Sequence, residues 1–258
     1  MKYDFIDRFS HLNSPLHRRD PRAKICAVVF AVIVIASAPR GPLEQFTGFY
    51  VLIAALIALS RVPLRFVVSR CLLASPFIVM AALLPFLSLW VEGAAAAGAD
   101  MATVSDQNAA AVRFALSVLL KAYAAIILLT LLTSTSRFDH LLWGLRRLKA
   151  PEILNVIATL MYRYIFILLD EWRRTTQARQ IRTPGGLRVS RLGLFGKHVA
   201  LVFIRGWERA ERVQAAMTVR GFRGEFPLAR ASRFQAADAL FLIVMVASFL
   251  GVRIAMRA

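Results

Sequence analysis

The sequence predicts an all-α, polytopic membrane protein with about five transmembrane helices and further long helices on the cytoplasmic side. Hydrophobic residues make up 58% of the 258-residue chain, and its net charge is +18. Soluble domains hold about 45–50% apolar residues. The apolar residues here stand in long blocks with the basic residues in the gaps, whereas a nucleic-acid-binding protein spreads basic residues over a soluble fold. The composition therefore favours a bilayer and argues against nucleic acid as a partner.

Five apolar runs are predicted to cross the membrane. They are residues 25–38, 46–59, 71–91, 114–133 and 236–252. Asp20 and Pro21 mark the start of the first helix as N-cap and first helical residue. That run has only 14 residues, short of the roughly 20 that a span needs, so Arg22 and Lys24 are expected to snorkel from its first turn. Lys121 interrupts the fourth run, where we favour a structural role over a paired polar site.

The distribution of lysine and arginine predicts the orientation. Six lie in the N-terminal segment up to residue 24, three in the 60–70 connection and nineteen in 134–235. The 39–45 connection has one, and 92–111 has none. Because cytoplasmic loops carry the excess of positive charge, the N-terminus and residues 134–235 are predicted to be cytoplasmic and the C-terminus extracytoplasmic, in the cell inner (plasma) membrane.

The basic region 134–235 is predicted to form helices. An amphipathic helix is expected over 137–149, a long one over 151–182 and a second long one over 197–222. Residues 153–169 are apolar, but three polar residues interrupt them and the arginines that follow would become extracellular if they crossed. We therefore expect 151–182 to be one helix of about 48 Å along the inner face. The predicted domains are 1–133 with four spans, 134–235, and 236–258 with the last span.

Two segments of this region look alike. Ala178-Arg179-Gln180 and Val219-Arg220-Gly221 each place an arginine near the end of a predicted long helix, ahead of glycine. An arginine there can simply satisfy free carbonyls and oppose the helix dipole. Two copies in one very basic region favour a pair of docking points instead.

Three blocks of sequence resemble a known family. They are Asp20-Pro21-Arg22-Ala23-Lys24, the block from Met161-Tyr162-Arg163-Tyr164 to Asp170-Glu171, and Glu211-Arg212 leading into Ala216–Phe222. Together they resemble the transmembrane (T) component of energy-coupling-factor transporters, most closely its cobalt branch, the CbiQ family. The resemblance implies a non-catalytic scaffold that joins a membrane subunit for substrate capture, CbiM/CbiN-like, to two cytoplasmic ABC-type ATPases, CbiO-like.

The resemblance also implies the coupling residues. In that family two x-Arg-x motifs at the ends of long helices sit in grooves of the ATPases. They correspond here to Ala178, Arg179 and Gln180, and to Val219, Arg220 and Gly221. Gln180 and Val219 depart from the family's common Ala-Arg-Gly or Ala-Arg-Ser form, while both arginines are kept. Cobalt ions are the implied cargo.

Other signals are missing from the sequence. It has no G-x-x-x-x-G-K-[ST] loop, its four histidines stand singly, and its two cysteines form no ligand cluster, so we expect no catalytic, cofactor-binding or metal-binding residues. Asp170 and Glu171 are expected to pair with arginines of their own helix. The alternatives left open are the same role in a nickel or vitamin importer, a membrane enzyme acting on an anionic lipid phosphate, and a scaffold that only holds anionic lipid.

Overall fold

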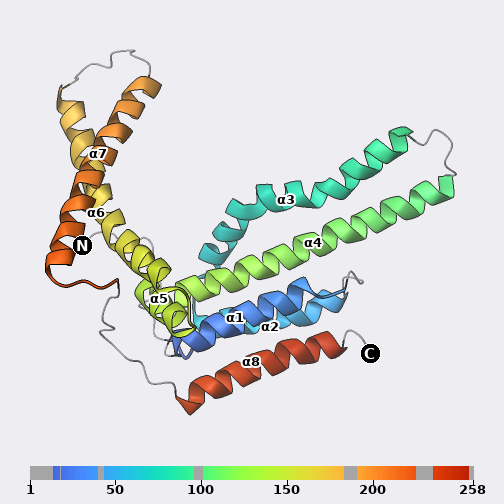
Figure 1. Cartoon of the computed structure of the whole chain (residues 1–258). Coiled ribbons are helices and arrows are strands. Elements are labelled where there is room, and N and C mark those ends of the chain that lie inside the picture. The colour runs from blue at the N-terminus through green and yellow to red at the C-terminus, as the bar shows by residue number, and fades with distance from the viewer. Residues whose placement is uncertain are drawn as a thin grey trace. The chain divides into compact units, whose positions relative to one another are not determined.

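The computed structural model describes residues 14–17, 19–39, 44–95, 101–182, 191–224 and 235–255. Every regular element within these ranges is a helix, which confirms the all-α class (Figure 1). The helices are α1 (Pro21–Ala36), α2 (Glu44–Ser60), α3 (Leu64–Ala95), α4 (Met101–Thr135), α5 (Phe138–Arg147), α6 (Glu152–Arg182), α7 (Arg191–Val219) and α8 (Ala236–Ala255). The described residues between 145 and 231 form one compact unit, and those between 4 and 144 form another with those between 232 and 258. The predicted domain limits of 1–133, 134–235 and 236–258 stay a prediction.

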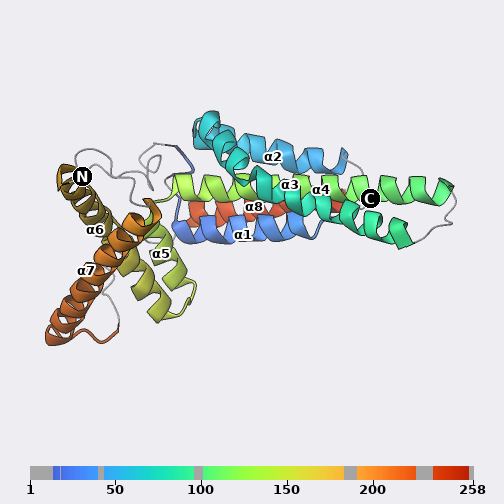
Figure 2. The ribbon, with the colours of Figure 1, turned by 90° about the horizontal axis from the view of Figure 1, so that it is seen from above.

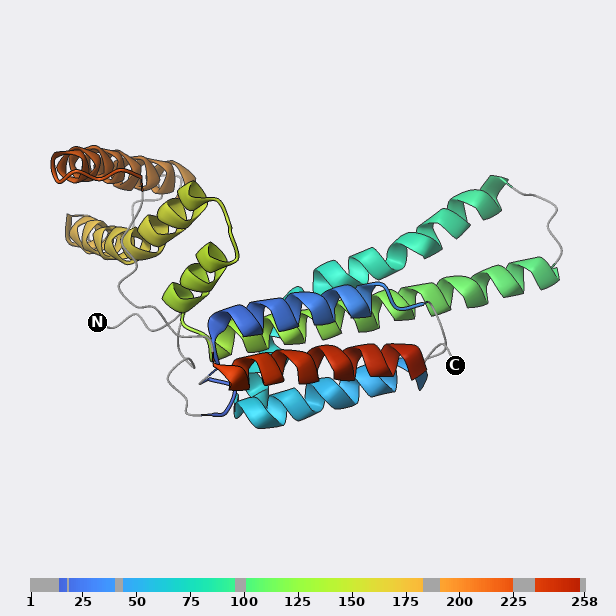
Figure 3. The same cartoon turned by 60° about the horizontal axis from the view of Figure 1, so that its bottom comes forward.

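The second unit is a helical bundle of α1, α2, α3, α4 and α8. α1 packs against both α4 and α8, and α2 fits beside the same two helices (Figure 3). The rings of Phe49 and Phe249 stack at the centre with their centroids 6.0 Å apart. A Cβ added to Gly48 would lie 2.8 Å from Cγ1 of Val252, so α2 and α8 approach as closely as a glycine allows. α3 runs beside α4 (Figure 2).

The outer surface of the bundle is apolar, as a lipid-facing surface must be. On α3, Leu73 and Phe77 are 70% and 72% exposed. Among the described residues, four helices are long and apolar enough to cross a membrane, over Leu64–Leu84, Ala111–Thr135, Glu152–Ala178 and Ala236–Ala255, with a shorter apolar helix at Phe46–Ser60. The protein is therefore a multi-pass membrane protein.

Two helices need comment as candidate spans. α1 has only 16 residues, so its place as a span rests on its packing in the bundle. α6 qualifies by length and composition although we expected it not to cross. Its polar interruptions and the positive charge that follows still argue against crossing, and that interpretation stays a prediction.

The short helix α1 is capped by cations from its longer neighbours. Nζ of Lys121, on α4, donates to the carbonyl oxygens of Ala36 at 3.2 Å and Ala38 at 2.6 Å. Nη1 of Arg253, on α8, donates to the Val34 carbonyl at 3.3 Å. The last carbonyls of a helix lack partners within it and carry the negative end of the dipole. Lys121 therefore has the structural role that we favoured.

The other unit consists mainly of α6 and α7, which run antiparallel and cross (Figures 1 and 2). α6 begins and ends within one residue of the prediction. α7 begins at Arg191, earlier than the expected 197, and ends at Val219 rather than at Phe222. The Pro184-Gly185-Gly186 segment, whose residue types are typical of a helix stop, lies outside the described residues.

Candidate functional site

The end of α7 is a glycine-capped helix terminus that places Arg220 at its tip. The backbone N–H of Phe222 donates to the Met217 carbonyl at 3.0 Å, and that of Gly221 donates to the Thr218 carbonyl at 3.0 Å. Gly221 has φ +77°, the left-handed conformation that a residue with a side chain avoids. These are the bonds of a Schellman motif, and they make Arg220 the C-cap residue.

The residues around this cap face outwards. Val219 is 88% exposed, and Arg220 is exposed as well. A Cβ built on Gly221 would meet nothing within 4 Å, so its backbone conformation, and not crowding, demands glycine there. The positive φ of this cap is the reason that position 221 of the Val219-Arg220-Gly221 segment is a glycine.

The Ala178-Arg179-Gln180 segment is built differently. α6 continues to Arg182, so Arg179 lies inside the last turn of a helix and not at a glycine cap. Both arginines lie near the ends of their helices, as expected, and Arg220 stands at a glycine cap. Ala178 is exposed and Ile181 is 80% exposed, whereas the side chains of Arg179 and Gln180 lie outside the described part of the chain.

The two helices contact each other along one side of their crossing. Leu168 packs where Gly206 leaves room, since a Cβ there would be 3.1 Å from Cδ2 of Leu168. Glu171 forms an ion pair with Arg205 of α7. We expected Glu171 to pair with arginines on its own helix, which is wrong because the crossing brings Arg205 within reach.

His198 also lies in this crossing, although no sequence motif predicts a role for it. It is 7% exposed, and its ring meets the Trp172 ring edge-on with centroids 4.1 Å apart. Read along the chain it is a single histidine without a motif. It lies at the beginning of the helix predicted over 197–222, and nothing else in the sequence distinguishes it.

A second cluster of polar residues lies in the bundle around the Asp20–Lys24 block. The Asp20 carboxylate accepts a hydrogen bond from the Arg22 backbone N–H at 2.9 Å and so caps α1 as predicted. The Asp20 backbone N–H donates to Oδ1 of Asp238 at 3.1 Å, and Oδ2 of Asp238 accepts from the Gln235 N–H at 3.1 Å. Asp238 thereby joins the beginnings of α1 and α8.

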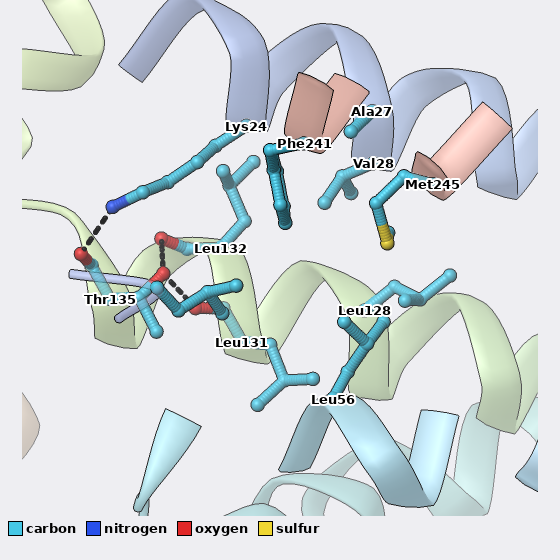
Figure 4. Close-up of a pocket in the computed structure, with 11 residues that line it drawn as sticks. Lys24, Ala27, Val28, Leu56, Leu128, Leu131, Leu132, Thr135, Phe241 and Met245 are labelled. Atoms are coloured by element: carbon cyan, nitrogen blue, oxygen red, sulfur yellow. Dashed lines mark hydrogen bonds between the residues drawn. The ribbon is translucent and has the colours of Figure 1, made fainter. Parts of the chain in front are cut away.

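Lys24 ties α1 to the end of α4. Its Nζ donates to the Thr135 carbonyl at 2.9 Å (Figure 4), to Oγ of Ser136 at 3.1 Å and to the His17 carbonyl at 3.4 Å. The side chain is buried, so the expected snorkelling is wrong for Lys24: carbonyls of the same unit take the place of water. The buried carboxylates of Asp20 and Asp238 lie on the same side of the bundle and favour its charged form.

Arg22 turns to another neighbour. Its guanidinium carbon lies 4.3 Å above the centre of the Trp143 ring on α5, a cation–π contact. Gly144 of α5 lies against Pro21 and Ile25, since a Cβ there would come within 3.3 Å and 3.1 Å of them. The Asp20–Lys24 block thus connects α1, α4, α5 and α8.

The hollow beside Lys24 is not a substrate site. Figure 4 shows that its wall is made mainly of apolar side chains, among them Phe241 and Met245. Its volume of ≈ 20 Å³ leaves room for about one water molecule. In the part of the chain that the structure describes, no three His, Cys, Asp or Glu side chains are grouped so that they could hold a metal ion.

Fold and site together define a multi-pass helical membrane protein that carries a basic, antiparallel helical hairpin. The family described as "CbiQ: Cobalt transport protein" matches residues 12–228, most of the chain, and this protein belongs to it. The match includes the Asp20–Lys24 block and both arginine segments.

Several named proteins are similar over most of their length. "Cobalt transport protein CbiQ" of Rhodobacter capsulatus is 27% identical over 212 residues, which are 81% of each chain. "Energy-coupling factor transporter transmembrane protein EcfT" of Thermanaerovibrio acidaminovorans is 31% identical over 85% of this chain and 83% of that protein. The EcfT protein of Listeria innocua is 28% identical over 87% and 86%.

Proposed function

We propose that this protein is the transmembrane scaffold (T) subunit of an energy-coupling-factor importer for cobalt ions. Its family and its EcfT relatives support the scaffold role, and the names of the family and of the Rhodobacter relative favour cobalt. The subunit is non-catalytic, and ATP is hydrolysed by partner ATPases of the ABC type, CbiO-like. A CbiM/CbiN-like membrane subunit captures the ion.

The observation that carries the proposal is the exposed, glycine-capped end of α7 within the region that matches the family. The Schellman motif fixes the backbone on both sides of Arg220 and uses the helix-end carbonyls of Met217 and Thr218 for itself. The guanidinium therefore does not need to cap its own helix. It presents a planar fork of donors that suits a carboxylate or a set of carbonyls in a partner's groove.

Arg179 is the second docking point of the proposal. It lies near the end of α6 as Arg220 does at the end of α7, and the antiparallel hairpin sends these two ends in opposite directions. Two separated docking points suit a pair of ATPase subunits, so that closure of the pair would strain or tilt the hairpin. Both arginines are then cytoplasmic, with the N-terminus on the same side of the inner membrane.

The test removes the two guanidinium groups. Truncating one side of a desolvated charged pair costs about 2–5 kcal/mol, whereas a rim charge is worth less than about 1 kcal/mol. The double variant Arg179→Ala/Arg220→Ala should lose ATPase pull-down from detergent and uptake of labelled Co²⁺, while still inserting in the membrane. The matched control is Arg174→Ala/Arg209→Ala, two exposed arginines of the same helices that should keep both. Single variants should keep part of the pull-down, since two linked sites bind with avidity.

The two parts of the proposal fail separately. Full pull-down by the double variant would refute the docking role of the arginines. Uptake of Ni²⁺ in place of Co²⁺ by the wild-type complex would refute the cobalt assignment and leave the scaffold role standing. Turnover of a lipid phosphate by the purified chain alone would favour the enzyme alternative.

A further inference from the structure

The crossing of α6 and α7 is held at two places. One is the close approach of Leu168 to Gly206, beside the Glu171–Arg205 ion pair. The other is His198, eight residues earlier on α7 and so about 12 Å away along that helix. A single contact lets two helices rotate about it, whereas two separated contacts fix the angle between them.

His198 is held by directional interactions. Its Nε2 lies 3.1 Å from Oγ1 of Thr176 and 3.4 Å from Oγ1 of Thr175. Each hydroxyl also lies 2.8 Å from a carbonyl of its own helix, that of Trp172 for Thr176 and that of Glu171 for Thr175. A carbonyl only accepts, so each hydroxyl proton is used there and its oxygen is left to accept. The proton between the helices therefore belongs to Nε2 of His198.

Aromatic contacts fix the same point. The His198 ring meets Trp172 edge-on at 4.1 Å and 76°, and Phe195 meets the same indole at 5.8 Å and 67°. Edge-to-face geometry is the favoured arrangement of such rings. His198 is buried although its neighbours Lys197 and Val199 are exposed, so this one side chain of the turn enters the crossing.

The position of this contact decides how far a change in the crossing angle would move each arginine. Arg179 follows Thr176 by three residues and lies close to the crossing. Without His198 the helices would rotate about the Leu168–Gly206 contact, and Arg220 follows Gly206 by 14 residues, about 21 Å along α7. A rotation of about 10° about that contact would therefore move the Arg220 end by about 4 Å relative to α6 and its Arg179.

We propose that His198 is a positioning residue that sets the crossing angle of α6 and α7 through its Nε2–H bond to Thr176 and Thr175 and its packing on Trp172. It thereby sets the separation of Arg179 and Arg220. The geometric part stands on the hairpin alone, and its consequence for ATPase docking rests on the proposed function.

The test measures the crossing angle in the full-length protein in lipid nanodiscs. Cys26 and Cys71 are replaced by alanine, and spin labels are attached to cysteines placed at the exposed positions Gln177 and Ala215. Double electron–electron resonance gives the distribution of distances between the labels. His198→Leu should broaden this distribution or shift it by about 2 Å, the movement of residue 215 for the same 10° rotation about the Leu168–Gly206 contact.

Matched variants separate positioning from simple loss of fold. His198→Gln keeps an N–H donor near the position of Nε2 and should restore most of the wild-type distribution. Thr176→Val removes the nearer acceptor without changing the shape and should shift the distribution in the same direction as His198→Leu. Lys197→Ala, at the exposed neighbour, should leave it unchanged.

The same variants are then tested for ATPase pull-down. An unchanged distance distribution in His198→Leu overturns the inference, whatever the pull-down gives. A changed distribution that His198→Gln restores supports it. If the distribution changes and the pull-down does not, the role of His198 in the hairpin stands and its proposed consequence for ATPase docking fails.

Discussion

Replacing Lys24 by methionine should destabilise the bundle, because the lysine serves three acceptors from two other parts of the chain. Methionine keeps the length and apolar character of the stem. It leaves the Thr135 carbonyl, the Ser136 hydroxyl and the His17 carbonyl without the ammonium. It also removes the cation that faces the buried carboxylates of Asp20 and Asp238.

The magnitude follows from these contacts. An acceptor left unsatisfied in a buried site costs about 1–3 kcal/mol. Two of the three bonds, those to Thr135 and Ser136, have normal hydrogen-bond lengths. Methionine also avoids the desolvation cost of burying an ammonium group, which offsets part of the free energy lost with these bonds. We expect a loss of about 3 kcal/mol in the free energy of unfolding, which for a chain of this size lowers Tm by roughly 6–12 °C.

The assay is thermal unfolding of the purified protein in detergent, followed by circular dichroism. Lys149→Met is the control, because Lys149 is exposed, and it should change Tm by less than about 2 °C. A Tm for Lys24→Met within that same margin of the wild type would show that the buried bonds contribute nothing net. The view of the Asp20–Lys24 block as a structural tie would then be wrong.

The remaining predictions concern packing, the cap of α7 and topology. Gly48→Ala should lower stability by about 1–3 kcal/mol, since its Cβ would clash with a valine of α8, whereas Gly251→Ala, with open space around it, should be neutral or stabilising in the same unfolding assay. Gly221→Ala forces φ +77° on a residue with a Cβ and should weaken ATPase pull-down while Arg220 is retained; normal pull-down would mean that the cap geometry does not matter. In a cysteine-free background, a cysteine at Pro39 should react with an impermeant thiol reagent added outside cells and one at Gln214 should not. Labelling of residue 214 from outside would show that α6 crosses the membrane.

The sequence predicted those features that depend on neighbours along the chain. Pro151 with Glu152 in the first turn gave the start of α6 to within one residue, and Asp20 caps α1 as expected. The second long helix was expected to run to Phe222 and instead ends at Val219, where Gly221 takes the left-handed conformation two residues later. Helix caps and stops are decided within a few residues, so a linear pattern contains them. The sequence also predicted a membrane protein, because hydropathy and charge distribution are properties of the chain itself.

Only the tertiary structure decided what the polar side chains do. Lys24 was expected to reach for water and instead meets Thr135, a residue 111 positions away. Glu171 pairs with Arg205 across the crossing, and His198, which no motif marked, fills the gap beside Trp172. A buried polar group takes whichever partner the packing of helices brings within about 3 Å, since leaving it without one is costly. The identity of the partner therefore depends on which helices pack together and at what angle. Neither can be predicted from a local sequence pattern.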